Sequence, residues 1–227
     1  MIFEKVNVDF DFMKLRKDVL ATYNSIIAEA AGTEHEFLAY RNQSITVSEK
    51  DSTDWTDSVA GKTFVNKTRL DTSVSLSTQL TREQNEMLNE RQYIHPLKQI
   101  QGTYLEEFVQ SIKGAYRWRI SILPPRTTLS IHVDGHDHMS SLQGGSAILT
   151  WRLHFPIKTT NRAFIVGWPD DFKSVEHSGE EITLQMANFK TQNSYLLDTS
   201  KIHCATNYSN EVRIHLIASL DKDEFLG

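Results

Sequence analysis

The stretch SILPPRTTLSIHVDGHDH, residues 121–138, decides both the expected fold class and the chemistry to look for. Polar and apolar residues alternate with a period of two from Thr128 to Asp134, which indicates a β-strand. His132 and Asp134 stand two residues apart near the end of a predicted strand, so their side chains leave the same face. Two imidazoles with one carboxylate suit iron(II). An H-x-D tripeptide also arises by chance, and His132 could equally be a polar residue at a strand end.

Seven short strands separated by turn-rich segments are predicted after Gly114, where the apolar pattern changes from helical to alternating. They are Tyr116–Leu123, Thr127–Val133, Ala147–Phe155, Ala163–Trp168, Glu181–Phe189, Ser194–Leu197 and Glu211–Leu220. The segments carry neither internal repeats nor the alternation of strands with helices that a parallel sheet needs. This half of the chain therefore predicts an antiparallel sandwich or barrel.

The N-terminal half has a helical pattern instead. An apolar stripe at three- and four-residue steps predicts a helix from Asp11 to Ala31. A second helix is expected from Thr81, and a third from Pro96 to Gly114. Residues 33–80 are rich in Ser, Thr and Asp and predict short strands at most. We expect one domain over residues 1–227, in which a helical or irregular segment, residues 1–114, supports a β-rich segment, residues 115–227.

Composition narrows the classes of protein. A net charge of −5 argues against a nucleic acid or an anionic membrane as a partner. The only cysteine is Cys204, so no intrachain disulfide forms and a reducing compartment is expected. Glu4 and Lys5 interrupt any apolar signal segment, and no apolar run approaches the roughly 20 residues that span a bilayer. We therefore expect a cytoplasmic protein with no membrane partner.

Two further pairs of residues extend the candidate site. His203 and Arg213 are ten residues apart, on either side of a turn-like segment, so a hairpin would bring Arg213 back toward His203. A guanidinium binds a carboxylate bidentately and could hold the far end of a 2-oxo diacid. Arg152 and His154 share a strand face and add donors for an acidic ligand, although Arg152 could equally be a surface or salt-bridged arginine.

In their order and spacing these elements resemble the aspartyl/asparaginyl β-hydroxylase-like family of Fe(II)/2-oxoglutarate-dependent oxygenases. The family pattern is an L-P-P-G-like turn, H-x-D, R-L-H-x-P-I, F-x-V-G, D-x-S/T-x-x-H-x-x-x-N, and an arginine ten residues after that histidine. The matching elements here are Leu123-Pro124-Pro125, His132-Val133-Asp134, Arg152 to Ile157, Phe164 to Gly167, Asp198 to Asn207 with His203 between them, and Arg213. The resemblance covers about 100 residues, and Arg126 departs from it where the family often has glycine.

The resemblance implies a mainly β (α+β) fold, a double-stranded β-helix (a cupin-like jelly roll) with N-terminal supporting helices. It implies Fe(II), 2-oxoglutarate and O2 as cofactor and co-substrates, and succinate and CO2 as products. The implied iron ligands are His132, Asp134 and His203, and the implied co-substrate residues are Arg213, Arg152, His154 and Ser121. The implied substrate is an amino-acid unit, either a free amino acid or an Asp, Asn or Pro residue in a peptide.

Alternatives remain open at this point. His136 and His138 could form a rival metal pair, and His215 shares strand parity with Arg213, so it could reach the site or be a polar core residue. A cupin-like metal enzyme that does not use 2-oxoglutarate would have no need of paired arginines. A catalytically inert jelly-roll binding module would lack stoichiometric affinity for iron(II). The sequence does not predict the oligomeric state.

Overall fold

The computed structural model describes residues 2–57, 90–132, 151–168 and 184–227. Strands β5 to β12 are divided between two antiparallel sheets. The larger sheet has the order β1 (Phe3–Val6), β10 (Ser194–Asp198), β7 (Trp151–Lys158), β12 (Arg213–Leu220), β5 (Ala115–Leu123) and β2 (Asn42–Ser44). The smaller sheet has the order β6 (Thr127–His132), β11 (His203–Asn207), β8 (Ala163–Gly167) and β9 (Gln185–Ala187). A separate pair joins β3 (Thr46–Val47) and β4 (His95–Pro96).

The path of the chain between the two sheets defines the fold. From β5 onward the chain passes from the larger sheet to the smaller one and back, so that β5, β7, β10 and β12 lie in one sheet and β6, β8, β9 and β11 in the other. Eight antiparallel strands wound in this way form a jelly roll. The predicted fold class, a mainly β double-stranded β-helix with N-terminal helices, is confirmed.

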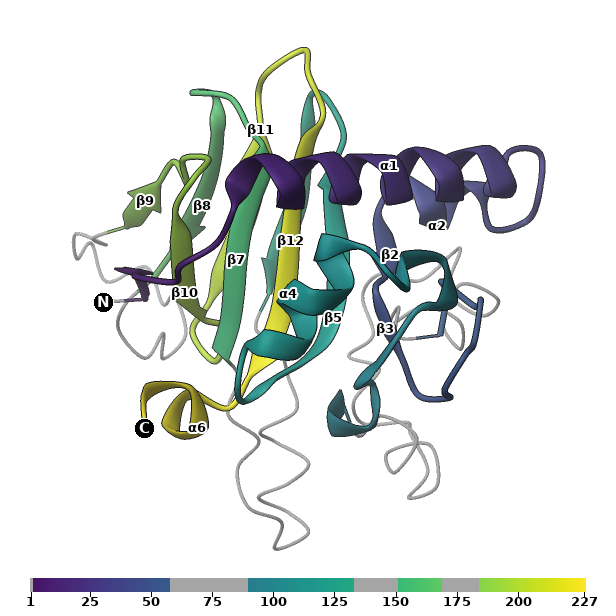
Figure 1. Ribbon diagram of the computed structural model, residues 1–227. Coiled ribbons are helices and arrows are strands. Elements are labelled where there is room, and N and C mark those ends of the chain that lie inside the picture. The colour runs from purple at the N-terminus through teal and green to yellow at the C-terminus, as the bar shows by residue number, and fades with distance from the viewer. Residues whose placement is uncertain (1, 58–89, 133–150, 169–183) are drawn as a thin grey trace, which may run out of the picture.

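The helices lie on one side of the larger sheet, where Figure 1 shows α1 and α4 crossing in front of its strands. Helix α1 (Phe12–Ala30) begins after Asp11, whose carboxylate accepts a hydrogen bond from the Lys14 N–H at 3.0 Å. Helix α4 (Tyr104–Ser111) is capped in the same way by Thr103. The shorter helical elements are α2 (Glu36–Ala39), η2 (Glu90–Gln92), η3 (Lys98–Ile100) and α6 (Lys222–Leu226).

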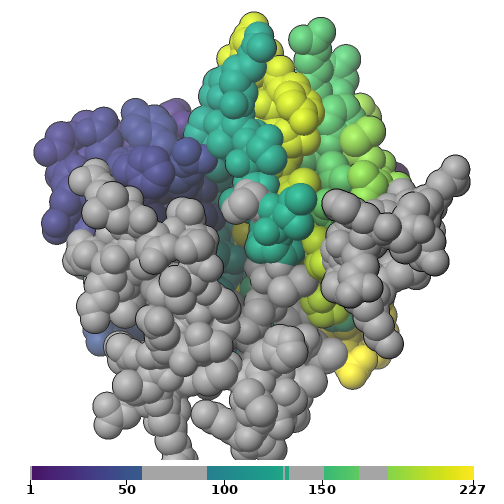
Figure 2. Space-filling view, turned by 180° about the vertical axis from the view of Figure 1, so that it is seen from behind, coloured from purple at the N-terminus to yellow at the C-terminus, as the bar shows by residue number. Residues whose placement is uncertain are grey.

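The main core fills the space between these helices and the larger sheet. Leu15 and Val19 of α1 and Phe108 of α4 pack there against Trp118 and Phe155 of the sheet. In the space-filling view from behind, the purple N-terminal segment lies to one side of the teal, yellow and green residues (Figure 2). The helices therefore stabilise the outer face of the larger sheet and leave its inner face to the smaller sheet.

The N-terminal segment also supplies strands. β1 pairs with β10 and β2 pairs with β5, so the N-terminal segment forms both edges of the larger sheet. None of the helices in the described stretches of the chain has the length and the apolar character needed to cross a bilayer.

Several predicted elements differ from the structure. The helix expected from Pro96 is wrong: Pro96 pairs with Thr46 in a short bridge, and helix α4 begins only at Tyr104. Gly102 adopts a φ of +75°, which interrupts any continuous right-handed helix across it. Of the strand predicted for 181–189, the described residues 184–189 contain the short strand β9, and the strand predicted to end at 155 continues to Lys158. The helix expected from Thr81 lies outside the described residues.

Strand β11 was not predicted. Its sequence His-Cys-Ala-Thr-Asn shows no clear alternation of apolar and polar residues, because all five side chains are buried. β11 lies between β6 and β8 in the smaller sheet, so both of its edges are paired. A strand buried on both faces and paired on both edges leaves no period-two signal in its sequence.

Candidate metal and anion site

The two faces of the larger sheet have different chemistry. On β12, Leu216 and Ala218 point outward into the core beneath the helices, while the alternate residues point toward the smaller sheet. Apolar residues of both sheets meet on this inner side, where Leu123 and Leu197 pack against Ile165 and Ala205. The inner face also carries most of the residues that were expected to bind a metal or an acidic ligand.

His132 and His203 come together across neighbouring strands. They are direct register partners, at the end of β6 and the start of β11, and their ring centroids lie 4.4 Å apart. A shift of register follows between His203 and Ala205. Such bulges are common where a strand must re-aim a side chain at a site. The two imidazoles are therefore positioned to reach one cation.

The hydrogen bond of His203 selects its tautomer. Nδ1 of His203 lies 2.8 Å from the carbonyl oxygen of Lys201, and since a carbonyl can only accept, Nδ1 is the donor. A neutral imidazole that carries its proton on Nδ1 has its lone pair on Nε2, where a metal binds. Histidine ligands of metals are commonly oriented by such a bond to a backbone carbonyl. This arrangement fits a metal-binding histidine.

The third expected ligand, Asp134, lies outside the described residues, as do His136 and His138 of the rival pair. Among the residues that the structure does describe, no group of three or more His, Cys, Asp or Glu side chains could hold a metal ion. The described portion of the candidate metal centre is therefore the His132–His203 pair. The complete ligand set and the choice between Asp134 and its rivals stay predictions.

Arg213 is the first residue of β12 and is only 5% exposed. Burial lowers the pKa of Arg213 to about 10, which still leaves the guanidinium charged at neutral pH. Its Nε and Nη1 have no hydrogen-bond partner within the described stretches of the chain. A buried charge is costly unless it is paired. This arrangement fits an arginine that binds an anionic ligand. A carboxylate suits it, because a guanidinium can donate two parallel hydrogen bonds to the two carboxylate oxygens.

The remaining expected residues lie on the same inner face. Arg152 donates from Nη1 to the hydroxyl of Ser219 on β12 at 2.5 Å. His154, two residues further along β7, lies with its Nδ1 3.5 Å from Nδ1 of His215. Ser121 on β5 is the direct register partner of His215. Sheet pairing thus brings donors from three adjacent strands to one surface.

Several arginines are buried among the residues that the structure describes. Four arginines, Arg117, Arg119, Arg152 and Arg213, are buried, whereas none of the buried side chains that the structure describes is a carboxylate. Arg117 also has a φ of +50° at the position where the β5–β12 register shifts, a conformation that is uncommon for residues other than glycine. Arg117, Arg119 and Arg152 have interaction partners within the protein, so Arg213 is the buried arginine whose charge favours an acidic ligand.

His215 is a residue whose place in the site sequence reasoning left open. It is 1% exposed and lies against Phe189 with nearly parallel rings. Burial, then the nearby charges of Arg213 and His154, hold the pKa of His215 well below its usual value, so the ring is neutral at neutral pH. Strand parity with Arg213 was the only signal for it in the sequence.

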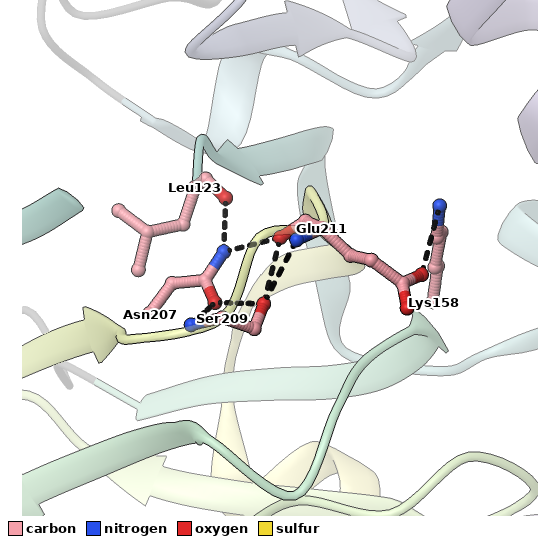
Figure 3. Close-up of polar contacts among 5 residues, drawn as sticks. All are labelled: Leu123, Lys158, Asn207, Ser209 and Glu211. Atoms are coloured by element: carbon pink, nitrogen blue, oxygen red, sulfur yellow. Dashed lines mark hydrogen bonds and ion pairs between the residues drawn. The ribbon is translucent and has the colours of Figure 1, made fainter. Parts of the chain in front are cut away.

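A network of hydrogen bonds fixes the corner where Arg213 begins its strand (Figure 3). The Asn207 side-chain amide donates to the carbonyls of Leu123, Pro124 and Glu211 at 3.0, 3.1 and 2.7 Å. Its oxygen accepts from the N–H and the hydroxyl of Ser209. Leu123 is the register partner of Arg213. Asn207 therefore ties together the two backbone segments next to Arg213, a role that the sequence motif alone did not reveal.

A scan against protein-family models and a search of curated proteins found no match to this sequence. Among solved structures, the chain is similar to the non-heme monooxygenase ThoJ in its nickel complex, with 11% identity and a TM-score of 0.46 over 96% of this chain and 72% of that one. It is also similar to SnoK, a non-heme alpha-ketoglutarate-dependent carbocyclase from nogalamycin biosynthesis, with 9% identity and a TM-score of 0.44 over 97% and 79%.

A Pseudomonas putida prolyl-4-hydroxylase is similar at 10% identity and a TM-score of 0.43, over 96% of this chain and 91% of that one. Each of these likenesses is one of overall shape at low sequence identity.

Proposed function

We propose that this chain is an Fe(II)- and 2-oxoglutarate-dependent oxygenase that hydroxylates an amino-acid unit. The observation that carries the proposal is the His132–His203 pair, in which His203 presents Nε2 for a metal while its Nδ1 donates to a backbone carbonyl. Arg213, buried on the strand that follows His203, adds a charged anchor for a dicarboxylate. The chain thus combines imidazole nitrogen ligands for iron(II) with a separate site for an acid.

The roles of the residues follow from their chemistry. His132, His203 and Asp134 would hold iron(II), a set of two histidines and one carboxylate that leaves three coordination positions open. When bound, iron(II) and 2-oxoglutarate supply the oxidising chemistry: one O2 is consumed, one oxygen atom enters a C–H bond of the substrate, and 2-oxoglutarate becomes succinate and CO2.

The protein contributes binding and positioning. Arg213 would pair with the distal carboxylate of 2-oxoglutarate, where the low polarity of the interior strengthens the ion pair. Ser121, Arg152 and His154 would add hydrogen bonds from β5 and β7. The apolar contacts between the two sheets, which include Leu123 and Ala205, would keep water away on this side of Arg213.

The nature of the substrate rests on the resemblance of residues 121–220 to the aspartyl/asparaginyl β-hydroxylase-like family. Asp134 is present at the carboxylate position of the metal site, which some members of that family lack. The proposed substrate is therefore an amino-acid unit, either a free amino acid or an Asp, Asn or Pro residue in a peptide.

The proposal is tested by adding iron(II) and then 2-oxoglutarate to the apoprotein without oxygen and recording the visible spectrum. We expect a weak charge-transfer band that needs both additions and is lost in His132→Ala and Arg213→Ala. The matched controls are His35→Ala and Arg162→Ala, which remove a histidine and an arginine outside the site and should keep the band.

The other outcomes are equally informative. Tight binding of the metal without a band on adding 2-oxoglutarate would contradict the co-substrate and support a cupin-like metal enzyme of another class. Failure to bind iron(II) at all would contradict an oxygenase and support an inert jelly-roll binding module. Once the band is established, amino acids and short peptides containing Asp, Asn or Pro are screened by the succinate that they release.

A further inference from the structure

The pairing of β5 with β12 places one more polar residue, His215, next to two of the residues that are expected to bind 2-oxoglutarate. His215 is the direct register partner of Ser121, and Arg213 precedes His215 by two residues on the same strand. Residues at i and i+2 leave the same face of a strand, and direct partners have Cβ atoms about 4.5–5.5 Å apart. Any group that contacts both Ser121 and Arg213 therefore lies beside His215.

His215 and Arg213 also share an unusual state. Nε2 of His215 and both Nε and Nη1 of Arg213 are buried and have no hydrogen-bond partner among the described residues. Buried polar groups are nearly always hydrogen-bonded, so each exception needs an explanation. Two such side chains next to each other on one face are explained together if a single ligand with several acceptor atoms binds between them.

A carboxylate has the required acceptor capacity. Its two oxygens offer about four lone-pair positions, of which a bidentate guanidinium uses two. A neutral imidazole can donate to a third position, provided that its other nitrogen accepts a hydrogen bond. Nδ1 of His215 lies 3.5 Å from Nδ1 of His154. When Nδ1 of His154 carries the proton, Nδ1 of His215 accepts this hydrogen bond. The proton of the neutral His215 ring is then on Nε2, which can donate to a ligand.

We propose that His215 is a further binding residue for the distal carboxylate of 2-oxoglutarate, to which its Nε2–H donates beside Arg213 and Ser121. This inference rests on the proposed function and extends its co-substrate site by one residue. The imidazole supplies a directed hydrogen bond without a second positive charge next to the guanidinium. Burial, Arg213 and His154 all lower the pKa of His215, which keeps the ring in that neutral form.

The experiment measures binding calorimetrically with the nickel(II)-loaded protein, which needs no turnover. The ligands are 2-oxoglutarate and 2-oxopentanoate, which has the same chain length but lacks the distal carboxylate. The variants are His215→Leu, which removes the donor, and His215→Gln, which restores a donor on a flexible side chain. Ile217→Ala is the matched control, since Ile217 lies two residues further along the same face of β12 and has no polar group.

We expect His215→Leu to weaken 2-oxoglutarate binding about tenfold, as for the loss of one hydrogen bond to a charged group. The same variant should leave the affinity for 2-oxopentanoate and for nickel(II) unchanged. His215→Gln should recover most of the loss, and Ile217→Ala should bind both ligands like the wild type. Thermal unfolding followed by circular dichroism establishes that each variant is folded.

Three results would overturn the inference. Unchanged 2-oxoglutarate affinity in folded His215→Leu would show that the imidazole is a core residue. An equal loss for both ligands would place its effect away from the distal carboxylate. Failure of the wild type to bind either ligand would overturn the proposed function together with the inference, whereas the first two results leave that function standing.

Discussion

The two faces of strand β12 are equally buried but have opposite roles. On the outer face, Leu216 and Ala218 are fully buried in the core beneath α1 and α4. On the inner face, Arg213 and His215 are buried at 5% and 1% exposure, and each has polar atoms that lack a partner in the described structure. Apolar burial stabilises a fold, whereas burial of unsatisfied polar groups destabilises it. Apolar burial therefore accounts for the outer face, whereas the unpartnered polar atoms of the inner face are those that the proposed ligand would satisfy.

The largest expected effect comes from the outer face. Leu216→Ala removes most of a fully buried side chain, so we expect the free energy of unfolding to fall by about 2–5 kcal/mol. The affinity of the folded variant for 2-oxoglutarate should stay within about threefold of the wild type. Urea denaturation and calorimetry measure the two quantities. A strong loss of ligand binding in the folded variant would contradict the division between the faces.

An inner-face substitution should have the reverse effect. Arg213→Met removes a buried charge and keeps an apolar side chain of similar length, so the unliganded protein should be as stable as the wild type or more stable. Binding of 2-oxoglutarate should weaken by about 2–3 kcal/mol, the worth of hydrogen bonds to a charged group. Arg162→Met, at an exposed position, is the control for both measurements. A large loss of stability in Arg213→Met would mean that the arginine is structural.

Asn207 should contribute both to the stability of the fold and to ligand binding, because its hydrogen bonds hold the backbone next to Arg213. Asn207→Ala leaves three backbone carbonyls without their donor, and we expect a loss of about 1–3 kcal/mol in stability together with weaker 2-oxoglutarate binding. Asn188→Ala is a matched control, because the Asn188 amide donates to the carbonyls of Thr160 and Ala163 in a corner that does not carry Arg213. It should lose stability alone. Equal ligand affinities in the two variants would count against a positioning role for Asn207.

The smallest effect is a dependence of stability on pH. The pKa of folded His215 is depressed, so as pH falls below about 6.5 the unfolded chain takes up a proton that the folded protein excludes. The contribution of His215 is therefore fully present above that pH and is lost as the pH falls, by at most about 1.4 kcal/mol per pH unit. Denaturation of the wild type and of His215→Leu at pH 7.5, 6.0 and 5.0 measures it, and the variant should show the shallower slope. Parallel slopes would mean that folding does not lower the pKa of His215.

Regular patterns in the sequence predicted much of the fold. Helix α1 was expected from Asp11 to Ala31 and spans Phe12–Ala30, because its apolar stripe and its Asp11 cap are local signals. Strands β5, β6, β8, β10 and β12 were found to within about two residues, since each has one apolar face and one polar face or a clear boundary. The pattern failed at Pro96, where a pairing with Thr46, far away in the sequence, prevails over local helical spacing.

For the candidate site, too, some features could be predicted from the sequence and others were revealed only by the structure. The sequence by itself identified the candidate residues of the site, among them His132, His203 and Arg213. Spacing within a motif also indicates which residues share one face of a strand, because side chains two positions apart point the same way. Only the tertiary structure decided that these histidines face each other, that Asn207 braces the corner, and that His215 lies opposite Ser121. Those relations depend on the register between strands that are distant in the chain. The hydrophobic pattern says which face of each strand is buried, but which residues of two distant strands lie opposite one another is decided only when the strands pair in the folded sheet.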